Sequence, residues 1–341
     1  EGKECLTVLD FIGQANKKYN FEDKFAALLS NTTHSVRSEV KNGFVSAPKG
    51  CYIQLERKAQ QYILENIRAS FGNTAGLVSR IATFEEDSGT SLSLTHFAEY
   101  YHMNLRSIYV RSSFSRLCVM AGMRDDFSEP LEEALTKAFP RFCSVDSRRF
   151  ITFVLDCLIG EKAAFTEAEQ RMLQMFQFTI WQKSAEDCGF FSPMEGVEAV
   201  KNCPVLCAEL VELLRYNYEH IDFIDESVDV GFDCPLDLHC TYSRDQILVA
   251  LDFMKPTTVQ EGVKWLPEKG LDLFFITLNK SNKDYSPTTM YNDYSINETL
   301  FHWQSQSTTA AESPTGLRYR GHRLGGSKVL LFVREFKTER I

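Results

Sequence analysis

The chain has 341 residues, of which 44% are hydrophobic and 24% charged, and its formal net charge is −9 at pH 7. The length suggests two or three domains, and the composition is typical of a globular protein. No apolar run approaches the roughly 20 residues of a membrane-spanning helix. The negative charge excludes a protein that coats nucleic acid uniformly, although residues 300–341 hold 7 Lys and Arg against 3 Asp and Glu.

The first 50 residues are predicted to be the tail of one domain followed by a linker. Residues 5–12 have the composition of a short buried strand, and residues 21–29 carry apolar side chains at helical spacing. Residues 30–50 are rich in Ser, Asn, Thr, Gly and Lys, which favours an exposed loop. The chain begins abruptly and without a secretory signal, so we expect a fragment of a longer cytoplasmic protein.

Residues 51–235 are predicted to form an all-helical bundle. Apolar stripes with helical spacing run through 131–139, 149–159, 166–182 and 205–216. Ser93 precedes one helix, and Gly122 follows a short one as a candidate C-terminal cap. Strand-like alternation is scarce in this region, which favours helices joined by short connections.

Residues 236–341 are predicted to be rich in strands, after one helix that Ser243 caps at its N-terminus. About five strands in this length predict a small β-barrel or a strongly twisted sheet. The fold class is therefore α+β, a helical bundle followed by a barrel-like domain. The predicted strands cover residues 271–278, 289–296, 300–306, 317–322 and 328–336.

One of these strands, F-H-W-Q-S-Q, places side chains of different character on its two faces. Alternation puts Phe301 and Trp303 on one face, where core packing is the favoured role. His302, Gln304 and Gln306 fall on the other face as a neutral row of hydrogen-bonding groups. This row is either a solvated surface or the lining of a recognition site.

Known catalytic and cofactor motifs are missing from the sequence. It has no phosphate-binding loop, no H-E-x-x-H and no G-x-S-x-G, so we expect no ATPase, nuclease or other enzyme activity and no cofactor in this chain. Glu335-x-Lys337 imitates only half of a nuclease motif. The ten cysteines lack the paired spacing of a zinc site, which favours reduced, packed thiols and no metal.

The C-terminal third resembles the domain of uncharacterised function at the end of large bacterial superfamily II helicases, many of which carry a phospholipase-D-type nuclease. Their best-known relatives are the SauUSI-type restriction enzymes, which attack DNA with modified cytosine. The N-terminal L-T-V-L-D-F-I-G-Q-A and the central L-C-V-M-A-G-M resemble the end of the helicase domain and the helical spacer. The stretches that carry the C-terminal likeness are L-H-C-T-Y-S-R-D-Q-I-L, E-G-V-K-W, L-F-F-I-T-L-N-K, Y-S-P-T-T-M-Y-N-D-Y-S-I, L-F-H-W-Q-S-Q-S, G-L-R-Y-R-G-H and V-L-L-F-V-R-E.

The resemblance implies a recognition region for double-stranded DNA that reads modified cytosine by base flipping, next to helicase and nuclease domains of the parent chain. Flipping needs aromatic side chains, base-edge hydrogen bonds and cations for phosphates. The alternative is a scaffold or homodimerisation spacer that docks on the helicase and binds no nucleic acid. The candidate nucleic-acid-binding residues are Lys280, Tyr291, Asp293, His302, Trp303, Gln304, Gln306, Arg318, Tyr319 and Arg320.

Overall fold

The structure, a computed structural model, divides the chain into two compact units, Glu1–Phe127 and Ser128–Ile341. This division falls inside the predicted helical region, and the predicted boundaries at 50 and 235 stay predictions. The predicted strand at residues 5–12 lies outside the described part of the chain. The structure describes residue 25 and residues 39–41, 43–44, 53–60, 63–64, 74–101, 103–160, 162, 164–259, 262–279, 293–297, 299–306, 309–325 and 327–336.

The first unit contains short helices around an aromatic core. Ser93 caps α5 as predicted, because its side chain accepts a hydrogen bond from the backbone N–H of His96. Gly122, at φ +72°, follows α7 and confirms the predicted C-terminal signal. The helices are α4 (Thr74–Ser88), α5 (Leu94–Tyr100), α6 (Leu105–Tyr109) and α7 (Phe114–Met120).

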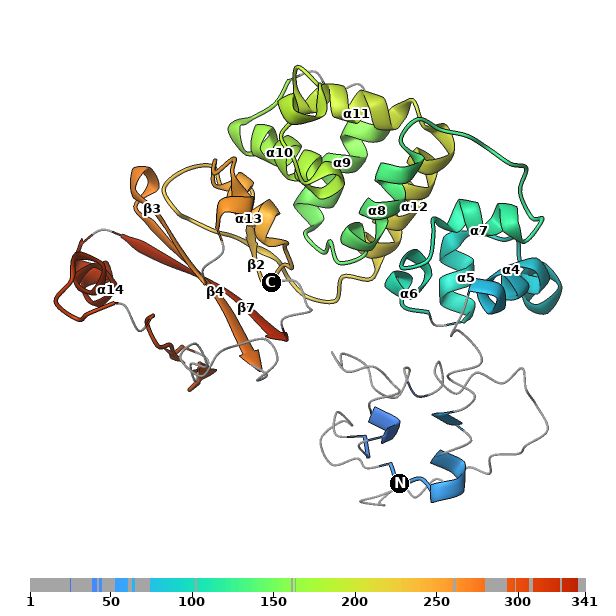
Figure 1. Cartoon of the computed structure of the whole chain (residues 1–341), viewed down its shortest axis with the longest axis horizontal. Helices are drawn as coiled ribbons and strands as arrows, with labels where there is room; N and C mark the ends of the chain where they lie inside the picture. The colour runs from blue at the N-terminus through green and yellow to red at the C-terminus, as the bar shows by residue number, and fades with distance from the viewer. Residues whose placement is uncertain are drawn as a thin grey trace. The chain divides into compact units, whose positions relative to one another are not determined.

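The second unit begins with a helical bundle in which α10 is the central helix (Figure 1). Thr166 and Glu169 form a capping box at the start of α10, and almost every residue of its second half is buried. The predicted helical stretches are confirmed, whereas α11 had no counterpart among them. The bundle consists of α8 (Glu132–Phe142), α9 (Arg148–Ile159), α10 (Glu167–Trp181), the 3₁₀ turn η1 (Glu186–Cys188), α11 (Pro193–Lys201) and α12 (Pro204–Glu219).

The rest of the second unit combines short strands with two helices. Ser243 caps α13 and forms a capping box with Gln246, which confirms the predicted helix start. The elements are β1 (Glu226–Ser227), β2 (Asp237–Leu238), α13 (Arg244–Ala250), η2 (Pro256–Thr258), β3 (Val263–Leu266), η3 (Pro267–Lys269), β4 (Leu271–Asn279), β5 (Tyr294–Ser295), β6 (Phe301–His302), α14 (Pro314–Gly325) and β7 (Lys328–Phe336).

The main sheet has the strand order β3-β4-β7. β3 and β4 are antiparallel and join through Gly270, whose φ of +62° suits a residue without a side chain. β4 and β7 are parallel, so the chain must cross over between them, and this crossover carries β5, β6 and α14. The α+β class is confirmed, whereas a closed barrel is not found among the strands of the described residues.

The prediction of a strand at residues 317–322 is wrong, because this segment lies in α14. Ser313 accepts a hydrogen bond from the N–H of Gly316, and Pro314 occupies the first helical position, where its missing N–H is not needed. The alternation of Leu317 to His322 therefore reflects the two sides of a helix.

Helix α13 attaches the sheet to the bundle by packing along α10 (Figure 1). Ile247 and Leu248 are fully buried, and the Gln246 amide donates to the Thr179 hydroxyl of α10 at 2.9 Å. On its other side, the Arg244 guanidinium makes a cation–π contact with Phe275 of β4, 5.2 Å from the ring centre. No helix within the described ranges is long and apolar enough to cross a membrane.

Candidate nucleic-acid interface

Strand β4 presents a mixed set of side chains to α14. Successive side chains of a strand point to opposite faces, so Asp272 and Phe274 lie on one face of β4, and Leu273 and Phe275 lie on the other. The Asp272 carboxylate is unusual because its side chain is only 1% exposed and its neighbours along the strand, Leu271 and Leu273, are fully buried leucines. A buried carboxylate needs a partner, and α14 supplies it.

Arg318 of α14 is the partner of Asp272. Its Nε and Nη2 atoms donate to the two carboxylate oxygens at 2.8 and 3.0 Å, and the guanidinium lies 4.1 Å from the Trp265 ring centre. The hydrogen bond with Asp272 raises the pKa of Arg318 above its ordinary value. Arg318 is therefore an anchor that fixes α14 on the sheet, and its predicted phosphate contact stays a prediction.

An aromatic cluster, formed by Phe274, Trp303 and Tyr319, holds the same interface together. Trp303 stacks on Phe274 with ring centres 4.0 Å apart, and Tyr319 meets both rings edge-on at 5.2 and 5.3 Å. These rings pack against one another, as the core alternative for Trp303 requires. They join β4, the segment after β6 and α14.

The neutral row is divided between several environments. Only Phe301 and His302 belong to a strand, and His302 stacks on Tyr294 of β5 at 4.8 Å. The Gln304 side chain is exposed, while its backbone N–H donates to the buried Asp293 carboxylate at 3.0 Å. Asp293 thus closes the base of the β5–β6 ribbon, and Gln306 lies half-buried beyond it.

Arg320 lies on the outer side of α14. Residues two apart in a helix point about 200° from each other, so Arg318 and Arg320 do not share a face as the strand prediction required. Arg320 is 65% exposed and pairs with the exposed Glu312 at 3.0 Å, and Arg323 is also exposed. Lys280 and Tyr291 lie outside the described residues.

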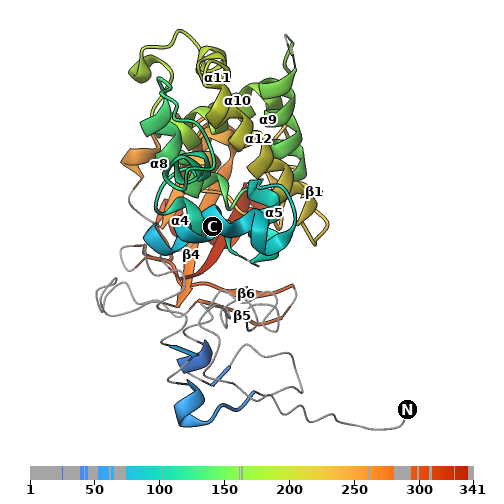
Figure 2. The same cartoon turned by 90° about the vertical axis from the view of Figure 1, so that its right-hand side faces the viewer.

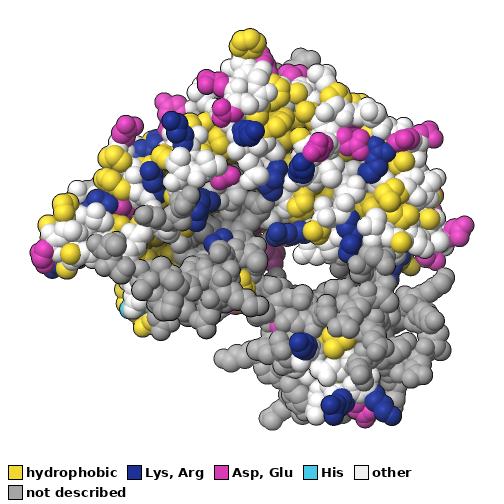
Figure 3. All heavy atoms as spheres, viewed as in Figure 1, with side chains coloured by type: hydrophobic (Ala, Val, Ile, Leu, Met, Phe, Trp, Pro, Cys, Tyr) yellow, Lys and Arg dark blue, Asp and Glu magenta, His cyan; other side chains and the backbone are white. Residues whose placement is uncertain are grey.

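The surface over α14 is mixed in character, with cationic, acidic and apolar side chains interspersed (Figure 3). Leu317 and Leu324 contribute exposed apolar groups beside Arg320. The positive charge of the C-terminal segment is therefore locally diluted, and α14 offers single guanidinium groups rather than a continuous basic patch.

Strands β5 and β6 lie within two of the predicted strands, and they pair side by side as an exposed hairpin (Figure 2). We call it the β5–β6 hairpin and define it by residues 294–297 and 299–302. Neither the pairing nor the exposure was predicted from the sequence. Tyr294, Ile296 and Leu300 are each about half exposed. The Asn297 side chain accepts from the N–H groups of Thr299 and Leu300, a turn that the apolar-flanked I-N-x-T-L sequence could have indicated.

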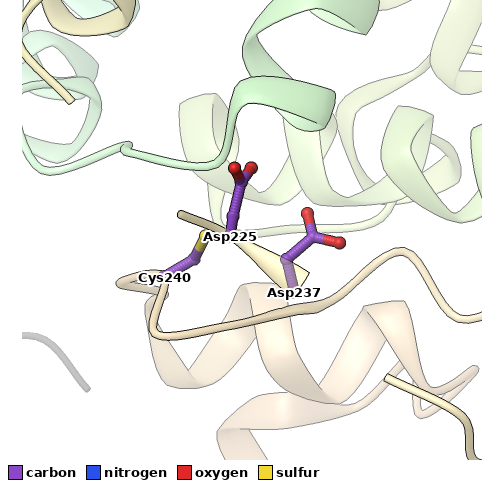
Figure 4. Close-up of side chains that lie close together, drawn as sticks. All are labelled: Asp225, Asp237 and Cys240. Carbon is purple, nitrogen blue, oxygen red and sulfur yellow. The ribbon is translucent and has the colours of Figure 1, made fainter. Parts of the chain in front are cut away.

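A cluster of Asp225, Asp237 and Cys240 has ligand atoms within 4.8 Å of one another, at the β1–β2 pair and the turn after it (Figure 4). Arg148 and Arg149 of α9 bind the two carboxylates at 2.7 and 2.8 Å. Internal cations already neutralise these carboxylates, so the arrangement is that of an ion-pair network.

The pKa values of this cluster follow from burial and from the arginines. Burial raises the pKa of Cys240 to about 12, so the thiol is protonated at neutral pH. Burial also raises the pKa of Asp237. Burial opposes ionisation of Asp225 too, but hydrogen bonds from Arg148 outweigh it and lower that pKa. A protonated thiol is a poor metal ligand.

A pocket of about 530 Å³ lies beside α9 and α12, and none of the candidate nucleic-acid-binding residues that the structure describes lines it. Its walls carry both charge signs, and the Lys162 ammonium in it is held by Glu169 at 2.5 Å. The pocket is lined by Leu155, Asp156, Ile159, Gly160, Lys162 and Arg215.

Comparison with known proteins identifies one segment. Residues 236–340 match the family model described as a domain of unknown function, DUF3427, which is known in helicase-associated proteins. No curated protein and no solved structure matches the chain. The matched segment contains α13, the β3-β4-β7 sheet, the β5–β6 hairpin and α14.

Proposed function

We propose that the chain is a non-catalytic DNA-binding region of a helicase-associated restriction or defence protein. The observation that carries the proposal is the attachment of α14 by the buried Arg318–Asp272 pair, which turns Arg320 and Arg323 outward. These guanidinium groups suit phosphate oxygens, which position a duplex without reading its sequence. The match of this segment to a helicase-associated domain supports the same assignment.

The finer part of the proposal is that the region prefers duplexes with modified cytosine and binds the extruded base. Its support is the resemblance of the C-terminal stretches to SauUSI-type enzymes. The Phe274, Trp303 and Tyr319 rings pack on one another, so the base would stack elsewhere, and the exposed Tyr294 of the hairpin is the described aromatic that we favour.

The test is a titration of the chain against matched duplexes with and without modified cytosine, at several salt concentrations. We expect tighter binding to the modified duplex and a linear fall of log affinity with log salt. Arg320→Gln and Arg323→Gln should each reduce the magnitude of that slope by about 0.9. Arg215→Gln, an exposed arginine on α12, is the matched control. Absent or salt-independent binding would refute the proposal.

A second candidate is a scaffold that docks on the parent helicase and binds no nucleic acid. The 96% exposure of Leu324 and the half-exposed Leu317 on α14 favour it, because apolar groups on an outer helix face suit a protein surface. This candidate predicts association with the parent's helicase domains that Leu324→Ser weakens, together with no retention on DNA.

A further inference from the structure

The β5–β6 hairpin carries its exposed apolar residues on one face. The register pairs Tyr294 with His302, and a backbone bond from Ile296 to Leu300 at 2.8 Å continues the ladder. Residues two apart on a strand point to the same face, so Ile296 and Leu300 extend the face on which Tyr294 and His302 stack. The face therefore begins with two stacked rings and ends with two branched aliphatic side chains.

Both ends of the hairpin are fixed. Asp293 lies just before β5 and Gln304 just after β6, and the Asp293 carboxylate accepts a hydrogen bond from the Gln304 N–H at 3.0 Å. Trp303 stacks on Phe274 of the sheet. At the tip, Asn297 binds backbone N–H groups of the turn. The hairpin is thus a pre-formed projection rather than a loose loop, which reduces the entropy lost when it inserts into a ligand.

The base of the hairpin lies next to α14. Trp303, which directly follows β6, contacts Tyr319 of α14 at 5.3 Å, and Arg320 is the next residue on that helix. A phosphate held by Arg320 would therefore bring a nucleic-acid strand close to the base of the hairpin. Apolar side chains beside phosphate-binding cations are the combination with which proteins part neighbouring bases.

We propose that the β5–β6 hairpin is a wedge that inserts Ile296 and Leu300 between adjacent bases, with Tyr294 as a stacking surface for a displaced base. This inference rests on the proposed DNA binding and adds the group that opens the duplex. An aliphatic pair unstacks a base step, and an exposed aromatic ring accepts the freed base whatever its sequence.

The experiment uses the whole chain and a duplex that carries 2-aminopurine, whose fluorescence rises when its base is unstacked. We expect binding to raise the fluorescence. The variant Ile296→Ser/Leu300→Ser should lose that rise and weaken binding about tenfold, because the apolar burial of both side chains is lost. The salt slope set by phosphate contacts should stay unchanged. The single variant Leu300→Ser should give an intermediate result.

Leu324→Ser is the matched control, because it also removes an exposed leucine but from α14. It should leave the fluorescence rise intact. If the wild-type chain binds no duplex, the proposed function itself fails. If it binds with the expected salt dependence but without a fluorescence rise, or if the double variant behaves as wild type, the wedge is overturned.

Discussion

Replacement of Arg318 by leucine should strongly weaken the attachment of α14 to the sheet. The change leaves the Asp272 carboxylate, 1% exposed, without its cation. Loss of one partner from a buried ion pair costs about 3–5 kcal/mol, and the contact with Trp265 at 4.1 Å adds about 1 kcal/mol. Together these contributions sum to about 4–6 kcal/mol. Because Arg318 itself is 20% exposed, we expect the free energy of unfolding to fall by about 4 kcal/mol, the lower end of that range.

The tryptophans of the chain provide a local reporter for this measurement. The chain has three tryptophans. Trp265 of β3 contacts Arg318, and Trp303 stacks on Phe274, so both lie where the sheet meets α14. In a Trp181→Phe background, urea unfolding followed by tryptophan fluorescence reports on this interface alone. With a slope of about 2 kcal/mol per molar urea, Arg318→Leu should lower the midpoint by about 2 M.

A double-mutant cycle separates the pair from the general effect of truncation. Asp272→Leu/Arg318→Leu replaces both charges with apolar groups, which is often nearly neutral for a buried pair. The double variant should therefore be at least about 2 kcal/mol more stable than Arg318→Leu alone. A cost below about 1 kcal/mol for the single variant, or strict additivity in the cycle, would refute the anchoring role.

Three further experiments test the rest of the architecture: a pair of glycine substitutions, a truncation and a titration. Gly316→Ala should destabilise α14 by about 1–3 kcal/mol in the same urea assay, because the added Cβ would collide with the backbone of the preceding loop. Gly321→Ala is the matched control, because a Cβ at this position meets open space, and it should stabilise the helix by about 0.5–1 kcal/mol. The fragment 236–341 should give no cooperative thermal transition, because the buried face of α13 loses α10, and a native-like transition would contradict this. Carbon-13 NMR should show Asp237 titrating above, and Asp225 below, the ordinary pKa of 3.8. A carboxyl whose pKa is lowered by folding stabilises the fold at pH values above its unfolded pKa, and this stability is lost as the pH falls. Asp225→Asn should therefore lower the free energy of unfolding at neutral pH and weaken the dependence of that free energy on pH below about 4.

Helix starts were predictable because their signals are local. Ser93 and Ser243 each bond a backbone N–H three residues ahead, so the cap is written in adjacent residues. The apolar stripe of α10 is equally local. Helix α11 escaped prediction because it is short and has Gly196, a poor helix former, in its interior. This glycine allows a close approach to α10, so the helix relies on packing that the local sequence does not show.

The candidate site was harder to predict because it depends on contacts between distant residues. The L-R-Y-R-G-H stretch alternates in character, and only the preceding Ser313-Pro314 pair identifies a helix start. Trp303 alternates as a core residue should, but its partner Phe274 lies on a strand 29 positions earlier, and nothing local selects it. The hairpin face likewise depends on a ladder register that alternation does not determine.

One long-range contact did leave a trace in the sequence. Asp272 interrupts the mainly apolar run L-D-L-F-F-I-T-L, and an acid in a stretch that is buried requires a cation from elsewhere in the chain. The Arg318–Asp272 bond answers that requirement, and it fixes which side of α14 faces outward. Because Arg318 of the R-Y-R stretch is bonded to Asp272, the proposed DNA binding by this helix should depend on the outward Arg320 and Arg323. A substitution of Arg318 should then weaken the proposed binding by releasing the helix that presents them.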